Sequence, residues 1–388
     1  MKNKLILTLL PIILLSACAK IDNNEENTIT VTDGIGRTVS LDPNKISKVV
    51  CVGAGALRYY SYIEGAKRLA GVEDIDNQSL RSETSPFSGV ARPYYDACKD
   101  EFDSLPTVGQ GGPMHQSPEL EKLAATSPDL IISDYETEEQ ASKMEEVTGA
   151  KVFTVKYGSK GVFDDNFSTT LISLGTILNQ SSRAKELVDY INKSKEEITN
   201  STSSSAKEKN VYIGGIGNWG QKDYLSTNPK YYPFQVANIK NVLGDDSLLT
   251  AGVQNIDKEK FTSIGNNIDV IILDCAGISK TIEAYKIDST IFDNVKAIQN
   301  NEVYISLPFN AYYQNIEIDL INTYYFASIV YPNCFGTDFN IESKADEILE
   351  KFVNKKIYSE LKEMKGQYGG YQKIKDFKKF LESDGKNE

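Results

Sequence analysis

A long helical pattern at residues 181–199 constrains the fold of this chain more than any other feature. The stretch reads SSRAKELVDYINKSKEEIT, and its apolar residues recur at helical spacing with charged residues between them. The residues of this apolar face are Ala184, Leu187, Val188, Ile191 and Ile198. A helix of this length reaches roughly 28 Å at ~1.5 Å per residue, about the width of a small domain. We therefore expect one long helix between two separately folded parts of the chain.

Strand patterns alternate with helical patterns on both sides of this stretch. A hairpin pattern opens the chain at 29–41, and apolar strand patterns follow at 46–53, 68–73, 128–135, 151–158, 210–215, 268–277 and 301–309. This alternation predicts parallel α/β architecture. The expected fold is two Rossmann-like lobes with central parallel sheets, at 29–180 and 201–388, joined by a single long α-helix at 181–200. One large continuous sheet is the alternative.

The N-terminus has the pattern of an export signal. Lys2 and Lys4 precede an apolar run, LILTLLPIILL, which is too short to span a membrane as a mature helix, and LSAC follows. This resembles the lipobox of bacterial lipoproteins, with Cys18 as the lipidated residue; a secretory signal with a chance cysteine is the alternative. The expectation is a signal peptide at 1–17, a polar tether at 18–28 and an extracytoplasmic, lipid-anchored mature protein.

Composition excludes several classes of function. The chain carries 54 acidic against 42 basic residues, a net charge of −12, so nucleic acid and anionic lipid surfaces are not expected partners. It has one histidine, which argues against multi-histidine metal sites and weakens any catalytic triad. Neither a G-x-S-x-G elbow nor a phosphate loop of the G-x-x-x-x-G-K type occurs. We expect neither enzymatic activity nor a resident cofactor or metal.

The cysteines of the mature chain match no metal knuckle. Cys51, Cys98, Cys275 and Cys334 lie far apart, and Cys51 falls within a strand pattern. We interpret them as small apolar interior residues, although export permits disulfides and the sequence leaves their pairing open.

Several motifs in order resemble the substrate-binding lipoproteins of ABC importers for iron complexes, haem and cobalamin, the class III periplasmic-binding-protein-like family. They are DGIGRTVSL at 33–41, ISKVVCVG at 46–53, LEKLAATSPDLIIS at 120–133 and IVYPNCF at 329–335. A second copy of the third motif lies at 258–273, two residues longer and with Ile268 in place of the proline. The resemblance implies a monomer that captures a small-molecule metal complex between its lobes and delivers it to an ABC permease with its cytoplasmic ATPase. A helical hinge of this kind is stiff, so lobe closure is expected to be small.

The resemblance also implies one permease-docking acid on each lobe. At the positions of this chain that match the family's motif, these acids are Glu121 and Glu259. The alternative is that each is one more solvated glutamate in an acidic chain.

The strand-to-helix turns, where ligands of α/β folds bind, are rich in aromatic and small polar residues. Tyrosine offers a flat apolar ring and a hydroxyl, which suits a flat chelate or tetrapyrrole, and a phenolate can ligate ferric iron; core packing is the alternative. The predicted ligand-binding residues are Arg58, Tyr59, Arg92, Tyr94, Tyr95, Gln110, Tyr135, Trp219, Tyr231, Tyr232, Asn310, Tyr312 and Tyr313. Arg58 and Arg92 are the candidates for an anionic ligand group because no arginine follows the central helix, which also puts a highly charged catecholate in doubt. His115, the single histidine, is a possible axial ligand only if haem binds.

The ligand class stays open at this point. An iron chelate (siderophore), haem or a corrinoid fits the aromatic turns, whereas a small oxyanion such as molybdate would require convergent backbone N–H groups without an aromatic cradle. A nucleotide-using surface enzyme is the third possibility, because VYIGGIGNWG at 211–220 spells G-x-G-x-x-G. That fingerprint requires a helix directly after the third glycine, and QKDYLSTNPK follows instead. We interpret the glycines as an open turn that brings Trp219 to the cleft.

Overall fold

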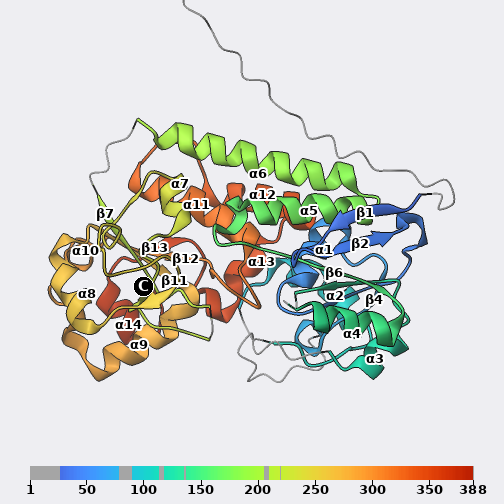
Figure 1. Ribbon diagram of the computed structural model, residues 1–388. Helices are drawn as coiled ribbons and strands as arrows, with labels where there is room; N and C mark the ends of the chain where they lie inside the picture. The colour runs from blue at the N-terminus through green and yellow to red at the C-terminus, as the bar shows by residue number, and fades with distance from the viewer. Residues whose placement is uncertain are drawn as a thin grey trace, which may run out of the picture.

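The computed structural model describes residues 27–77, 90–112, 118–134, 137–204, 209–218 and 220–387. Two α/β lobes lie side by side, and one long helix, α6 (Ser181–Thr202), runs along the same face of both (Figure 1). Each lobe has its own central sheet, so the two-lobe prediction is confirmed and the single continuous sheet is wrong.

The first lobe is built on a four-stranded parallel sheet in the order β4-β3-β5-β6. Its strands are β3 (Val49–Val52), β4 (Leu69–Gly71), β5 (Leu130–Ser133) and β6 (Lys151–Thr154). Its helices are α1 (Ala56–Glu64), α2 (Pro93–Asp103), α3 (Leu120–Ala125) and α4 (Glu138–Thr148). Strands β3 and β5 are buried along their whole length, which explains their continuous apolar pattern.

The predicted hairpin at the start of this lobe is confirmed. Strands β1 (Ile29–Thr32) and β2 (Thr38–Leu41) pair antiparallel, with Thr32 opposite Thr38. The turn is held by the Asp33 carboxylate, which accepts hydrogen bonds from the backbone N–H of Ile35 (3.1 Å) and of Arg37 (2.9 Å). The aspartate that marks the motif therefore closes the turn.

The second lobe is built on a five-stranded sheet in the order β13-β12-β11-β7-β9, parallel except for β13. Its strands are β7 (Asn210–Gly214), β9 (Lys240–Asn241), β11 (Val270–Asp274), β12 (Val303–Ser306) and β13 (Gln372–Lys373). A separate pair consists of β8 (Ser226–Thr227) and β10 (Gln254–Asn255). The helices are α7 (Tyr232–Val236), α8 (Lys258–Ile264), α9 (Ile278–Ile287), α10 (Lys296–Gln299) and α14 (Phe377–Glu382).

Short 3₁₀ turns connect many of these elements. They are η1 (Pro43–Lys45), η2 (Asp74–Asp76), η4 (Gly161–Phe163), η5 (Gly265–Asn267), η6 (Cys275–Gly277), η7 (Ser289–Phe292) and η8 (Lys365–Gln367). Two of them lie close behind strand ends of the two lobes: η2 contains the buried Asp76, and η6 follows the buried Asp274, the last residue of β11.

Helical layers cover the junction between the lobes. Helix α6 packs on α5 (Asp165–Ile177) and on α11 (Ile316–Val330), and the predicted apolar face of α6 is buried except for the half-buried Val188. Helix α12 (Ile341–Val353), followed by α13 (Tyr358–Glu363), contacts α1 and α2 of the first lobe. The chain beyond β12 thus packs against both lobes. The assignment of all residues after 200 to the second lobe stays a prediction.

One hydrophobic core runs through both lobes. It joins Val49 of the first sheet, Leu187 of α6, Ile321 of α11 and Ile272 of the second sheet in a single cluster of buried residues. A second cluster fills the far side of the second lobe. Across the described ranges, no helix combines the length and the apolar character that a membrane crossing requires.

Candidate functional site

The turns at the carboxyl ends of the parallel strands meet where the two lobes face each other. In the middle of this junction lies a segment of the second lobe, residues 309–315, which follows β12 and which we call the interlobe strap. Its own lobe holds it through the carboxylate of Asp274, which accepts the Phe309 N–H at 2.6 Å, and through a hydrogen bond from Asn315 N–H to the Phe309 carbonyl. First-lobe residues in contact with the strap include Arg58, Glu73 and Tyr157.

Arg58 of α1 is fully buried and binds the strap from the first lobe. Its guanidinium donates to the backbone carbonyls of Gln314 (2.6 Å) and Ala311 (2.9 Å) and to Oδ1 of Asn315 (2.7 Å). Its Nε lies 4.0 Å from Oε2 of the buried Glu317 in α11. A charged donor of the first lobe thus binds backbone carbonyls of the second lobe. Hydrogen bonds with a charged donor are stronger than those between neutral groups.

Glu73 forms a second link between the lobes. Its carboxyl group accepts the hydroxyl of Tyr312 at 2.5 Å and the N–H of Gly53 at 3.0 Å, and the Gly112 N–H donates to the same hydroxyl at 3.2 Å. Burial raises the pKa of Glu73 to about 8 against the opposing effect of these hydrogen bonds, so the carboxyl group is largely protonated at neutral pH. Glu73 is not among the residues predicted from the sequence, although an acid two residues after the end of β4 is a usable indication of a site residue.

Tyr313 joins the strap to an aromatic wall of the first lobe. Its ring centroid lies 4.2 Å from that of Tyr157, whose hydroxyl donates to the Gly55 carbonyl at 2.8 Å. Tyr157 is buried, whereas Tyr313 is half-buried and keeps part of its ring accessible. A flat apolar ligand could extend this pair by stacking.

Arg92 belongs to a buried network inside the first lobe. Its guanidinium and the Tyr94 hydroxyl both donate to Oδ1 of Asp76 at 2.8 Å, and its Cζ atom lies 4.5 Å from the Tyr95 ring centroid. Burial raises the pKa of Asp76, and the charge of Arg92 opposes that shift. The network fixes η2 against the start of α2.

Most of the predicted ligand-binding residues are interior in this structure. Arg58, Tyr59, Arg92, Tyr94, Tyr95, Tyr231 and Tyr312 are all buried. Hydroxyls among them bond to protein groups; that of Tyr59, for example, donates to the Lys156 carbonyl at 2.6 Å. Direct contact of these side chains with a ligand would require the interior around them to open, so their binding role stays a prediction.

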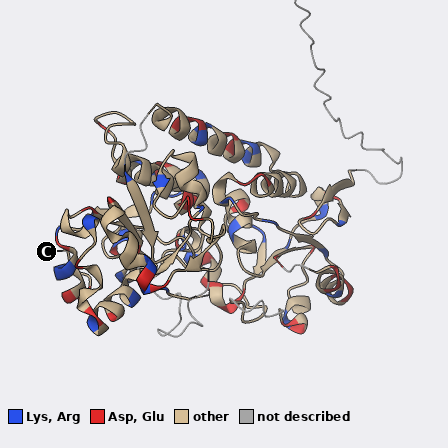
Figure 2. Ribbon diagram, turned by 60° about the vertical axis from the view of Figure 1, so that its left-hand side comes forward, with Lys and Arg blue, Asp and Glu red and all other residues tan. Residues whose placement is uncertain are grey.

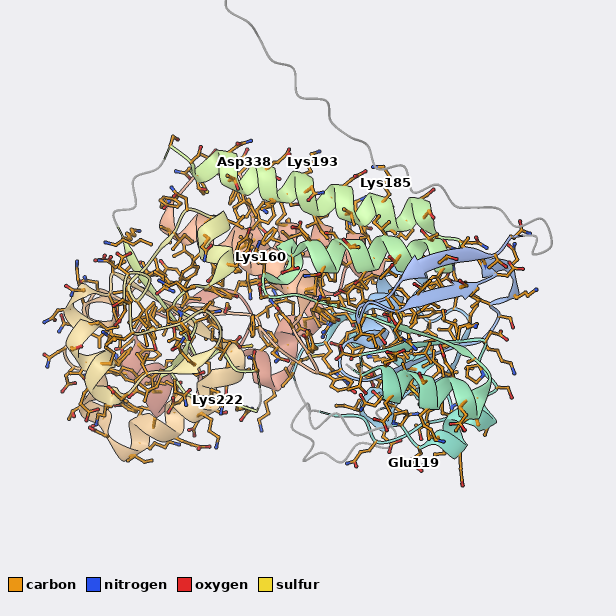
Figure 3. The ribbon with its side chains drawn as sticks, viewed as in Figure 1. Glu119, Lys160, Lys185, Lys193, Lys222 and Asp338 are labelled. Carbon is orange, nitrogen blue, oxygen red and sulfur yellow. The ribbon has the colours of Figure 1, made fainter. Side chains whose placement is uncertain are left out.

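Three of the accessible predicted residues belong to the strap or to the first-lobe loop whose Gly112 N–H donates to the strap. Gln110 of the first lobe is exposed, Tyr313 is half-buried, and the half-buried Asn310 donates to the Asn218 carbonyl at 2.9 Å. We group these three residues with Asn218 and with Lys222, which Figure 3 labels on the edge of the second lobe away from α6, under the name strap rim. The members of the strap rim are Gln110, Asn218, Lys222, Asn310 and Tyr313. Both lobes contribute to it, as a site between lobes requires.

Tyr232 lies elsewhere, close to α6. Its ring is 5.5 Å from the Lys160 ammonium and 5.6 Å from that of Lys195 on α6, and Figure 3 labels Lys160 beneath that helix. Tyr232 is half-buried and faces the hinge side of the junction, away from the strap rim. The predicted residues Tyr135 and Trp219, the possible axial ligand His115 and the lipidation residue Cys18 lie outside the described residues.

Gly215, the first glycine of the G-x-G-x-x-G letters, packs closely against the turn after β11. A Cβ atom on Gly277 would lie 2.4 Å from the Gly215 Cα and 2.7 Å from the Lys222 carbonyl oxygen, so the turns after β7 and β11 touch backbone to backbone. Gly215 also has a φ of 78°, which favours glycine. Strand β8 follows instead of a helix, and this confirms that the context of a dinucleotide site is missing.

The two predicted docking acids are exposed at opposite ends of the molecule. Glu121 lies in the first turn of α3 and Glu259 in the first turn of α8 (Figure 1). Within the described part of the chain, neither forms an ion pair. Acidic and basic positions are interspersed along α6 and over both lobes in Figure 2.

The described residues hold neither a disulfide nor a metal-binding cluster. Cys51 and Cys275 are buried and Cys98 and Cys334 are half-buried, all as free thiols. No group of three or more His, Cys, Asp and Glu side chains within these same ranges is placed to hold a metal ion. Two surface hollows of about 280–290 Å³ lie beside α14 and between α11 and α12, away from the strap rim.

Comparison with known proteins gives a consistent result. A family model described as periplasmic binding protein matches residues 80–308. The high-affinity heme uptake system protein IsdE of Staphylococcus aureus strain MRSA252 is 25% identical over 222 residues, covering 54% of this chain and 69% of its own. Among solved structures, a periplasmic solute binding protein from Veillonella parvula has a TM-score of 0.65 at 18% identity, covering 87% of this chain and 96% of its own. The molybdate-bound MolA of Haemophilus influenzae has a TM-score of 0.63 at 15% identity, covering 84% and 98%.

Proposed function

The chain belongs to the periplasmic binding protein family, and on that premise we propose that it captures an iron complex or a tetrapyrrole between its lobes. As a member of this family it is a solute-binding protein of ABC transporters and not an enzyme. The proposal concerns the ligand (a siderophore, haem or a corrinoid), the lipid anchor and the individual contact residues.

The observation that carries the ligand proposal is the strap rim with its stacked tyrosine pair. The rings of Tyr313 and Tyr157 are in contact across the junction, and the half-buried Asn310 of the strap donates to the Asn218 carbonyl. A planar chelate or macrocycle gains apolar contact from such rings, while the amides and Lys222 can bind its polar or anionic edge. The likeness to a heme uptake protein supports the same ligand class.

The alternative ligand, a small oxyanion, would need free backbone N–H groups at the strand ends. In this structure the Gly53 N–H donates to Glu73, and the N–H groups of Phe309 and Ala276 donate to Asp274. The carboxyl groups of the chain itself thus take the amide donors that a molybdate ion would use. This argues for the larger, partly apolar ligand.

A titration panel tests the ligand class. Ferric hydroxamate siderophore, haemin, cobalamin and molybdate are added in turn to the purified protein, and visible absorption and the fluorescence of the single tryptophan are followed. We expect saturable binding of at least one iron complex or tetrapyrrole at micromolar concentration or below. Saturable binding of molybdate alone would select the oxyanion alternative, and binding of none of the four would overturn the ligand proposal.

The proposed anchor and docking roles have separate tests. Cells fed labelled palmitate should label the wild-type chain and not the Cys18→Ala variant. Combined Glu121→Ala and Glu259→Ala substitutions should abolish ligand uptake and leave ligand affinity unchanged, because both side chains are exposed and neither belongs to the strap rim. A loss of affinity would contradict the docking role.

A further inference from the structure

The tip of the interlobe strap fills the place where the strand-end turns of the two lobes meet. The tip consists of Ala311, Tyr312 and Tyr313, and the first two of these residues are only 1% and 3% exposed. An iron chelate or a tetrapyrrole needs a cleft of roughly 300–1,000 Å³. The surface hollows beside α14 and α12 lie elsewhere. A ligand that binds between the lobes therefore competes with the tip for the same space.

The tip packs in a small apolar cluster of its own. Tyr312 packs with Ala54 and Ile75 of the first lobe, and the half-buried Tyr313 lies against this cluster. Neither Ala54, Ile75 nor Tyr312 belongs to the large core that joins the two lobes. Withdrawal of the Tyr312 side chain would thus leave the large core intact.

The backbone of the tip is strained. Tyr312 and Tyr313 have φ values of 52° and 77°, in the left-handed region that a tyrosine adopts only at a cost in free energy. Within the described ranges, they are the only two neighbouring residues other than glycine with a positive φ. The first lobe holds this conformation in place. The Tyr312 hydroxyl donates to Glu73 at 2.5 Å, and the Arg58 guanidinium donates to the Ala311 carbonyl at 2.9 Å.

The base of the strap is closed within the second lobe. The Asn315 N–H donates to the Phe309 carbonyl at 3.0 Å, and Asp274 accepts the Phe309 N–H. Between these ends, Asn310 and Gln314 form an antiparallel bridge. A loop whose base is closed can move its tip while the elements on either side stay in place.

We propose that the strap tip is a gate, which closes the ligand site in the ligand-free protein and moves out before a ligand binds. Opening breaks the hydrogen bond between Tyr312 and Glu73 and separates the rings of Tyr313 and Tyr157. Arg58 keeps its two acceptors at the base of the strap. The inference rests on the proposed function and adds a step that precedes binding. Because only the open form binds, the apparent affinity is reduced by the fraction of molecules that are open.

The Tyr312→Phe variant tests the gate, because it removes only the hydroxyl that holds the tip to Glu73. Haemin and the ferric hydroxamate siderophore are the probes, and stopped-flow fluorescence measures their association. For each probe that the wild type binds, we expect the association rate constant to rise at least ~3-fold and the dissociation constant to fall by the same factor. The reason is that the closed form loses a hydrogen bond. A hydroxyl that contacted the ligand directly would give the opposite change in affinity.

The matched control is Tyr212→Phe. The Tyr212 hydroxyl is also buried and donates to the Tyr224 carbonyl at 2.6 Å, in the cluster on the far side of the second lobe. This variant should bind both probes as the wild type does. Hydrogen–deuterium exchange of the ligand-free protein gives a second readout. The amides of residues 311–313 should exchange faster in Tyr312→Phe than in the wild type, and those of β11 should not.

Two results would overturn the inference. One is association of the probes with Tyr312→Phe at the wild-type rate or more slowly. The other is exchange of the tip amides that is equally slow in the wild type and in Tyr312→Phe. If the wild type binds none of the panel ligands, the proposed function fails, and the exchange of the tip amides still decides whether the tip opens.

Discussion

Arg58 contributes to the junction because nearly all of its donors are matched to acceptors of the other lobe. Its place in a strand-to-helix turn predicts a ligand-binding cation, but in the interior its charge neighbours Glu317, and the hydroxyl of Tyr62 also donates to that carboxyl group. No local pattern could reveal this, because the acceptors lie about 250 residues further along the chain.

Replacement of Arg58 should therefore be costly. We expect Arg58→Met to lower the free energy of unfolding by about 3–5 kcal/mol, since it leaves Glu317 buried without its cation and three acceptors of the strap without this donor. Chemical denaturation followed by circular dichroism measures this. Lys45→Met, at a side chain 84% exposed, is the control and should change stability by less than about 0.5 kcal/mol. A loss for Arg58→Met no larger than that of the control would refute the role of Arg58.

The raised pKa of Glu73 predicts that the stability of the protein decreases as pH rises. The pKa of Glu73 is raised by burial to about 8, and burial likewise raises those of Asp274 and Asp319 to about 7. Between the ordinary carboxyl range and pH 8 the folded state binds more protons than the unfolded chain, so the free energy of unfolding falls as pH rises. We expect a lower thermal midpoint at pH 8.5 than at pH 5.5.

The Glu73→Gln variant separates the contribution of Glu73 to this pH dependence from the contributions of Asp274 and Asp319. The variant keeps a neutral group of similar shape and should show a smaller decrease of the midpoint over the same interval. A midpoint that rises from pH 5.5 to 8.5, or an equal decrease in wild type and variant, would contradict the assignment of Glu73 as a buried, protonated carboxyl group.

At the scale of elements, the turns after β7 and β11 are held together through glycine. Gly277 has a φ of −91°, which any residue adopts, so only the missing Cβ matters there. We expect Gly277→Ala to push the two turns apart, to cost about 1–3 kcal/mol of stability and to weaken ligand binding through Asn218 and Lys222. Lys280→Ala in α9 is the control, and equal ligand affinity and stability for both variants would disprove the close-packing role.

The strands, the hairpin and α6 could be predicted because each follows from a local pattern. Strand β5 is a continuous apolar run since both faces are buried, and the hairpin turn follows from Asp33 and its neighbouring glycines. The interlobe strap could not be predicted, because its polar contacts join residues of both lobes. The tyrosine-rich turns were ambiguous for the same reason: Tyr312 is buried against Glu73 while its neighbour Tyr313 remains accessible in part.

At the scale of the whole molecule, three connections resist relative motion of the lobes. They are α6, the strap with Arg58, and α12, whose backbone carbonyls at Lys351 and Phe352 accept the Arg183 guanidinium of α6. A single core also crosses the junction. The lobes should consequently move little when a ligand binds.

Small-angle X-ray scattering tests this stiffness. For a compact chain of this length the radius of gyration is roughly 21 Å, and we expect it to change by less than ~1 Å when haemin is added to saturation. The Arg58→Met variant should scatter as a larger or more variable particle. A decrease of several ångströms in the wild type would indicate a hinged closure that these connections should prevent.

The central claim is that residues of both lobes hold an iron complex or a tetrapyrrole at the strap rim. Calorimetric titration of whichever panel ligand binds, into wild type, Gln110→Ala and Tyr313→Ala, tests it most directly. The account predicts one site per chain and weaker binding in both variants, one from each lobe, with unchanged unfolding midpoints. Wild-type affinity in both variants would contradict it.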